Sequence, residues 1–154
     1  MSVRVVSDIQ KIDSAIADIY AFLSDFSKIG KMIEMARQMG AGQQVPASLS
    51  DKIEDVRTTT DTCVFLVKNV GEMGLKIVER QEPTLIKMEG DGRVPFEIHL
   101  WIQLLNNGPY DTRMRITLEA DMNMMLKMML KGKLEKGINQ LAEGLAKIPY
   151  GYMK

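Results

Sequence analysis

The chain has 154 residues, of which 45% are hydrophobic and 26% are charged. That length and composition predict one globular domain, residues 1–154. Its 20 basic and 20 acidic residues give a formal net charge of zero. A neutral total argues against the broad basic surface of a nucleic-acid-binding protein, so we expect no nucleic-acid partner.

The compartment can be predicted from the cysteine content and the N-terminus. Cys63 is the single cysteine, so the chain forms no intramolecular disulfide, which fits a reducing compartment. The opening MSVRVVSDIQ lacks the apolar segment of a signal peptide. No apolar run approaches the roughly 20 residues that span a bilayer. We therefore expect a cytoplasmic protein without stable membrane insertion.

The first part of the chain predicts a strand and two helices. Residues Val3–Gln10 are rich in valine and isoleucine, which favours a strand, and Ser14–Phe26 carries apolar residues at helical spacing. Asp13 or Ser14 is expected to cap that helix, and Ser27 the next one. The second helix has the stripe Ile29, Met32, Ile33, Ala36 and Met39 and is expected to end at Gly40 and Gly42, before a loop over residues 41–51.

From Ile53 the apolar period changes to two, which predicts strands. The longest alternation is PFEIHLWIQLL. It places Phe96, Ile98, Leu100, Ile102 and Leu104 on one face and Glu97, His99, Trp101 and Gln103 on the other. Short turns with Gly, Pro and Asn separate the runs. Short links join antiparallel neighbours, so we expect a meander of about six strands with one apolar face.

A long C-terminal helix is expected to cover that apolar face. Its stripe consists of Leu126, Leu130, Leu134, Ile138, Leu141, Leu145 and Ile148. Gly137 and Gly144 lie on the same stripe, and each costs roughly 1 kcal/mol of helix stability against alanine. The expected compensation is a close approach of the helix backbone to the surface it covers.

The order of these elements resembles the helix-grip superfamily that includes START domains, birch-pollen allergens and polyketide cyclases, often called SRPBCC. The resemblance rests on the segments IYAFLSDFSKIGKM, LWIQLLNNGPYDTRMRITLEADMN and GINQLAEGLAKIPY, which look like the first helix, the last hairpin and the end of the gripping helix. It implies an α+β helix-grip fold in β-α-α-β6-α order. A strongly curved antiparallel sheet then wraps the long C-terminal helix and leaves a cavity for a hydrophobic molecule.

A run of methionines begins the C-terminal helix. Met125, Met128 and Met129 fall off the leucine stripe, whereas Lys127 falls on it. A straight helix would expose the methionines and turn Lys127 inward, but a bend at Gly132 would turn the methionines inward. Three interpretations stay open: core packing, the lining of a pocket near its mouth, and a surface for a partner or second subunit.

Residue types that carry chemistry are scarce. One histidine, His99, and one cysteine cannot form a histidine- or cysteine-based zinc site, and no phosphate-binding or dinucleotide motif occurs. We therefore expect no metal and no cofactor, and we assign no catalytic residue. The polar side chains nearest to the apolar face are Tyr20, Asp25, Arg57, Thr58 and Thr60.

The leading hypothesis is binding of a lipid, polyketide or aromatic metabolite between the sheet and the C-terminal helix, without catalysis. The expected lining residues are Phe65, Met73, Met88, Leu100, Met114, Met125, Met128 and Leu134. One alternative is a cyclase or dehydrase acting on a polyketide-like substrate. The other is an interaction module whose cavity is filled by its own side chains and which forms a homodimer through outer-face residues such as Trp101.

Overall fold

The computed structural model describes residues 2–38, 53–67, 71–93 and 96–150. The helices are α1 (Ile16–Leu23), α2 (Phe26–Gln38) and α4 (Met124–Ala146). The strands are β1 (Ser2–Val6), β2 (Gln10–Ile12), β3 (Ile53–Thr58), β4 (Thr62–Val67), β5 (Gly71–Gln81), β6 (Leu85–Gly90), β7 (Ile98–Gly108) and β8 (Asp111–Asp121).

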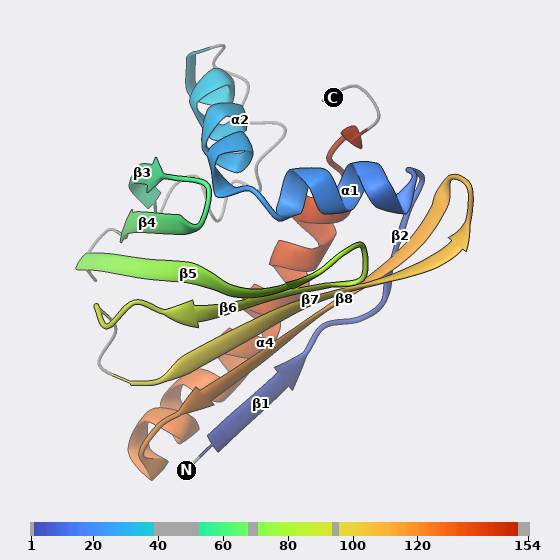
Figure 1. Ribbon diagram of the computed structural model, residues 1–154. Helices are drawn as coiled ribbons and strands as arrows, with labels where there is room; N and C mark the ends of the chain where they lie inside the picture. Colours follow the sequence, from blue (N-terminus) through green and yellow to red (C-terminus); the bar gives the residue numbers. More distant parts are fainter. Residues whose placement is uncertain (1, 39–52, 68–70, 94–95, 151–154) are drawn as a thin grey trace.

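All eight strands belong to one antiparallel sheet. Its order is β1-β8-β7-β6-β5-β4-β3, and β2 also pairs with β8. The six strands from β3 to β8 therefore form the predicted meander, and the N-terminal strand lies beside β8, the last strand in the sequence (Figure 1). The sheet is curved, and α4 crosses one of its faces, as the helix-grip prediction requires.

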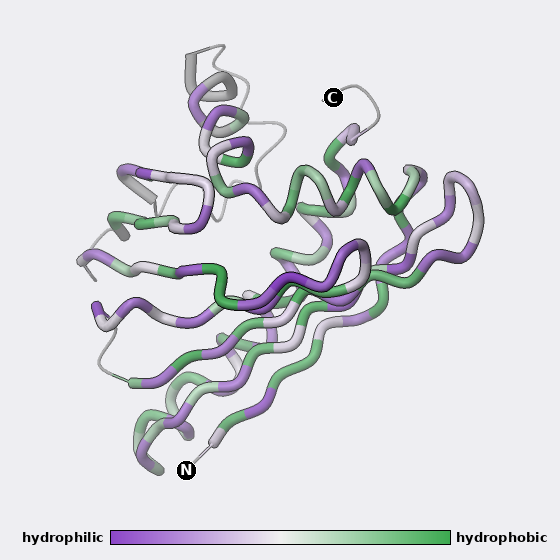
Figure 2. The backbone as a smooth tube through the Cα atoms, viewed as in Figure 1, coloured by the Kyte–Doolittle hydropathy of each residue, from purple (hydrophilic) through white to green (hydrophobic). Residues whose placement is uncertain are grey.

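The core lies between that face of the sheet and the helices. Ile86, Ile102 and Ile116 are adjacent in register on β6, β7 and β8, and each is buried. Polar residues alternate with them, so purple and green alternate along β7 and β8 in Figure 2. Burial of alternate apolar side chains fixes the register, because a slip of one residue would expose the whole set.

The N-terminal strand differs from its prediction because it is split in two. Val6 pairs with Thr117 and Gln10 pairs with Met114, so residues 7–9 stand opposite residues 115–116. Three residues opposite two is the count of a β-bulge. Ser7 bridges the break: its backbone N–H donates to the Ile116 carbonyl at 2.8 Å, and its hydroxyl oxygen accepts from Ile116 N at 2.9 Å.

The predicted helix caps are wrong by one or two residues. The N-cap of α1 is Ala15, which makes no side-chain hydrogen bond, while the Ser14 carbonyl accepts from the Thr112 hydroxyl at 2.9 Å. At α2, Asp25 takes the capping role expected of Ser27, because its carboxylate accepts from Ser27 N at 2.9 Å and from Ser27 Oγ at 2.6 Å.

Several sequence predictions fall outside the described residues. They are the end of the second helix at Gly40 and Gly42, the loop over residues 41–51, and the side chains of Ile33, Ala36 and Met39.

Candidate functional site

Helix α4 is continuous from Met124 to Ala146, so no interruption at Gly132 shifts the methionine run relative to the leucine stripe. The Asn123 side chain caps it by accepting a hydrogen bond from Leu126 N at 2.9 Å. A continuous helix keeps a period of 3.6 residues, and that period decides which side chains face the sheet.

The methionines at the start of α4 point away from the core. Met124, Met125, Met128 and Met129 are 60%, 72%, 80% and 62% exposed. Met125 and Met128 therefore lie on the outer surface of α4 and not among the inward-facing side chains where we expected them. The physical reason is the uninterrupted 3.6-residue period of α4, which keeps these methionines off the leucine stripe.

One flank of α4 is anchored to the β1, β2 and β8 end of the sheet. Ile138 and Ala142 on this flank are buried. Nearby, the Asn139 side chain accepts a hydrogen bond from Asp8 N at 2.8 Å, which ties the helix to the segment between β1 and β2. The helix therefore leans toward that end of the sheet.

The other flank of α4 is apolar but incompletely covered. Its side chains pack against the core and stay half-buried; they are Leu126, Leu130, Leu134, Leu141 and Leu145. Between Leu134 and Leu141, Gly137 is also half-buried, yet a Cβ built on it meets no heavy atom within 4 Å. The close backbone approach expected at Gly137 is thus absent, and the space beside it is open.

The inner face of β3, β4 and β5 is also apolar and incompletely covered. Phe65 pairs with Val56 and with Met73, and Cys63 pairs with Leu75, so these side chains share one face. All except Cys63 are half-buried. Phe65, Leu75 and Val56 pack against the same core as the leucines of α4. The candidate site therefore has two apolar walls, one on the helix and one on β3–β5.

Of the expected lining residues, the structure places Phe65, Met73 and Leu134 on these half-buried walls. Met88, Leu100 and Met114 lie on the inner face of the sheet but are closely packed, with exposed fractions of 3%, 6% and 1%. Sequence reasoning omitted Val56, Leu75, Leu126, Leu130, Leu141, Leu145 and Gly137 from the lining. Helical periodicity had already marked five of these as inward-facing, namely Leu126, Leu130, Gly137, Leu141 and Leu145.

Two of the polar side chains that the sequence pattern placed nearest to the apolar face have structural roles. Arg57 pairs with Glu72 at 2.6 Å on the outer face, and Asp25 caps α2. The Thr60 carbonyl accepts from Phe26 N at 3.1 Å. Tyr20 is buried, and its pKa is raised first by burial and then by the Glu82 carboxylate, against a smaller lowering by Arg80.

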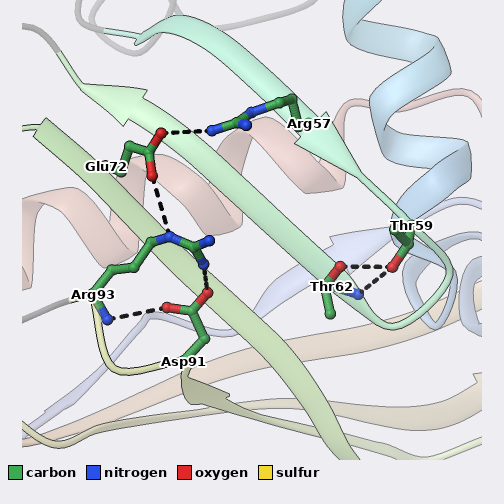
Figure 3. Close-up of polar contacts among 6 residues, drawn as sticks. All are labelled: Arg57, Thr59, Thr62, Glu72, Asp91 and Arg93. Carbon is green, nitrogen blue, oxygen red and sulfur yellow. Dashed lines mark hydrogen bonds and ion pairs between the residues drawn. The ribbon is translucent and has the colours of Figure 1, made fainter.

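The outer face of the sheet carries an ion-pair network that connects β3, β5 and the segment after β6 (Figure 3). Glu72 accepts from Arg57 at 2.6 Å and from Arg93 at 3.2 Å, and Arg93 also pairs with Asp91. A Cβ on Gly74 would overlap the Asp91 carboxylate. Glycine at position 74 therefore lets Asp91 lie over the sheet within this network.

His99 and Trp101 lie on the outer face, as predicted. Their rings stack at 5.9 Å between centroids, and the Lys87 ammonium lies 5.4 Å from the Trp101 ring. His99 Nδ1 is 3.5 Å from a Glu89 oxygen.

Within the described ranges, no group of three or more His, Cys, Asp or Glu side chains is placed to hold a metal ion. In the same part of the chain, no helix has the length and apolarity to cross a membrane.

No protein-family model matches this sequence, and no curated protein matches it either. Solved structures do resemble it. A point mutant of norcoclaurine synthase from Thalictrum flavum in complex with a transition-state analogue has a TM-score of 0.72 at 9% identity, covering 100% of this chain and 98% of its own. A START superfamily protein from Mycobacterium smegmatis has a TM-score of 0.64 at 14% identity, covering 94% of both chains.

The chain has the helix-grip fold. The likeness covers nearly all of the chain, and it confirms the predicted SRPBCC-type fold with its curved sheet and long C-terminal helix. A conserved protein from Geobacillus kaustophilus also has this arrangement, with a TM-score of 0.60 at 13% identity over 96% of this chain and 93% of its own. At such identities the likeness concerns the fold.

Proposed function

We propose that this helix-grip chain binds a hydrophobic or amphipathic small molecule between α4 and the inner face of β3–β5. The observation that carries the proposal is the open space beside Gly137, on a flank whose leucines are only half-buried. When a ligand covers apolar surface that the protein leaves exposed, the free energy of binding becomes more favourable by about 25 cal/mol per Å² of area removed from water. Ligand sites are typically concave and apolar, with few polar groups.

The structural likeness supports the same ligand class. Norcoclaurine synthase from Thalictrum flavum was solved with dopamine and hydroxybenzaldehyde, two aromatic molecules, at a TM-score of 0.69. We extend to this chain only the general use of the fold, a site for a small molecule with apolar surface. The protein would act by sequestering its ligand from water, in the cytoplasm.

The test is native mass spectrometry of gently purified protein, followed by organic extraction. Wild-type protein is expected to carry an extractable adduct, or to take up the hydrophobic probe ANS when empty. Gly137→Leu is expected to lose most of this binding, because its side chain fills the open space. Gly132→Leu is the matched control, since Gly132 also has no neighbour within 4 Å but is exposed on the methionine side.

If Gly137→Leu leaves binding unchanged, the ligand does not lie beside Gly137. The same conclusion holds if Gly132→Leu loses binding to the same extent as Gly137→Leu. A wild-type protein that is empty and ignores ANS would reject the function itself.

The interaction-module alternative now has a specific observation in its favour, the four exposed methionines Met124, Met125, Met128 and Met129. Exposed apolar patches mark interaction surfaces. This alternative predicts a homodimer whose population rises with concentration in sedimentation velocity. A monomer at all concentrations would reject it.

A further inference from the structure

One lysine lies on the apolar flank of α4. Lys127 precedes Leu130 by three residues and Leu134 by seven, so helix geometry places all three on one face. Lys127 is half-buried, whereas the three lysines that follow it on the helix, Lys131, Lys133 and Lys136, are exposed.

The ammonium group of Lys127 has no hydrogen-bond or ion-pair partner in the described part of the chain. No acidic residue occurs in the first turn of α4. The other half-buried lysine of the described residues, Lys87, has a Glu89 oxygen at 4.0 Å and the Trp101 ring beside it. A charge held against apolar surface costs free energy unless an opposite charge compensates it. Lys127 is therefore a half-buried cation on an apolar helix face, without an anionic partner among the described residues.

We propose, resting on the ligand site proposed above, that Lys127 binds the anionic head group of an amphipathic ligand. The head group is a carboxylate or a phosphate, and the apolar chain lies along Leu130, Leu134 and the open space at Gly137. The ammonium supplies a charge-assisted hydrogen bond, and the leucines supply the apolar contact. The ligand class is thus narrowed from any apolar molecule to an anionic amphiphile.

The test compares dodecanoate, dodecyl phosphate and dodecanol as competitors of a bound neutral fluorescent probe. They share a twelve-carbon chain and differ in head group. Wild-type protein is expected to bind at least one of the two anions about tenfold more tightly than dodecanol. Lys127→Met keeps the length and apolar character of the side chain but removes its charge, so the preference should disappear while dodecanol binding stays. Lys131→Met, at an exposed position of the same helix, should behave as wild type.

The outcomes separate the two proposals. A preference that is lost in Lys127→Met and kept in Lys131→Met supports the assignment, and the preferred anion identifies the head group. If dodecanol binds as tightly as both anions, or if the preference survives in Lys127→Met, the role of Lys127 is overturned and the binding function stands. If none of the three displaces the probe from wild-type protein, the anionic amphiphile is rejected as the ligand class, while the binding function is judged separately by the adduct and ANS test above.

Discussion

Cys63 illustrates how burial on the inner face controls the chemistry of a single side chain. The residue is 1% exposed on β4, and burial raises the pKa of its thiol from 9.0 to about 12. A thiol that stays protonated is a poor nucleophile, so Cys63 is suited to packing and not to catalysis. The alternation of side chains along β4 places Cys63 on the inward face, so its burial can be predicted from the sequence.

At pH 8 the Cys63 thiol is expected to react with a disulfide reagent much more slowly in the folded protein than in urea. Burial of the protonated Cys63 thiol also contributes to the free energy of unfolding. That contribution is present in full below pH 9 and is lost as pH rises toward 12, because the thiol of the unfolded chain ionises first. The measurement is the labelling rate followed by absorbance. Thr62→Cys in a Cys63→Ser background is the control, and it should react quickly because position 62 is exposed. Equal rates at the two positions would contradict the burial.

Gly74 permits the close approach of Asp91 to the sheet. Gly74→Ala is expected to destabilise the fold by about 1–3 kcal/mol, because the new Cβ must displace a carboxylate held by Arg93 and by the hydrogen bond from Asp91 N to the Gly74 carbonyl, 3.1 Å. Urea unfolding measures the change. Gly132→Ala, in open space on α4, should instead gain up to about 1 kcal/mol. The prediction fails if the two variants shift stability in the same direction.

At the scale of the elements, α4 shows what the sequence could and could not provide. Periodicity located the leucine stripe, because it follows from a regular 3.6-residue repeat. The orientation of Met125 and Met128 depends on whether Gly132 interrupts the helix. The presence of a glycine in the sequence does not decide between an interrupted and a continuous helix. The uncovered flank depends on the lean of α4 toward β1, β2 and β8, which is a property of tertiary packing alone.

The split of the N-terminal strand is a second feature that depends on tertiary packing and could not be predicted from the sequence. The valine and isoleucine content of Val3–Gln10 indicated a strand, but the extra residue of the bulge has no signature in that composition. Likewise Asp25, Ser27 and Ser14 are all suitable caps by type, and only the positions of the helix ends choose Asp25.

The cap of α4 gives a prediction at this scale. Asn123→Ala removes the hydrogen bond to Leu126 N and is expected to cost about 1 kcal/mol of unfolding free energy. Asn123→Asp should retain most of the stability, since aspartate accepts the same bond. Denaturation with urea distinguishes them, and equal stability of the alanine and aspartate variants would show that the cap contributes nothing.

For the molecule as a whole, α4 packs against the β1–β2–β8 end of the sheet, whereas the apolar side chains toward β3–β5 stay half-buried. The β1–β2–β8 end is closed by buried side chains such as Ile138 and by the Asp8–Asn139 hydrogen bond. Toward β3–β5 the two apolar walls are half-buried. The central claim is that a small molecule occupies the space between these walls.

Methionine methyl groups report directly on that space, because Met73 lies on the β3–β5 wall while Met124, Met125, Met128 and Met129 lie on the outer surface of α4. The measurement is an NMR titration of protein carrying ¹³C-labelled methionine methyls with ANS, whose aromatic rings shift nearby resonances. We predict that the Met73 methyl shifts while the four surface methyls stay in place. Shifts confined to the surface methionines would contradict binding between the walls.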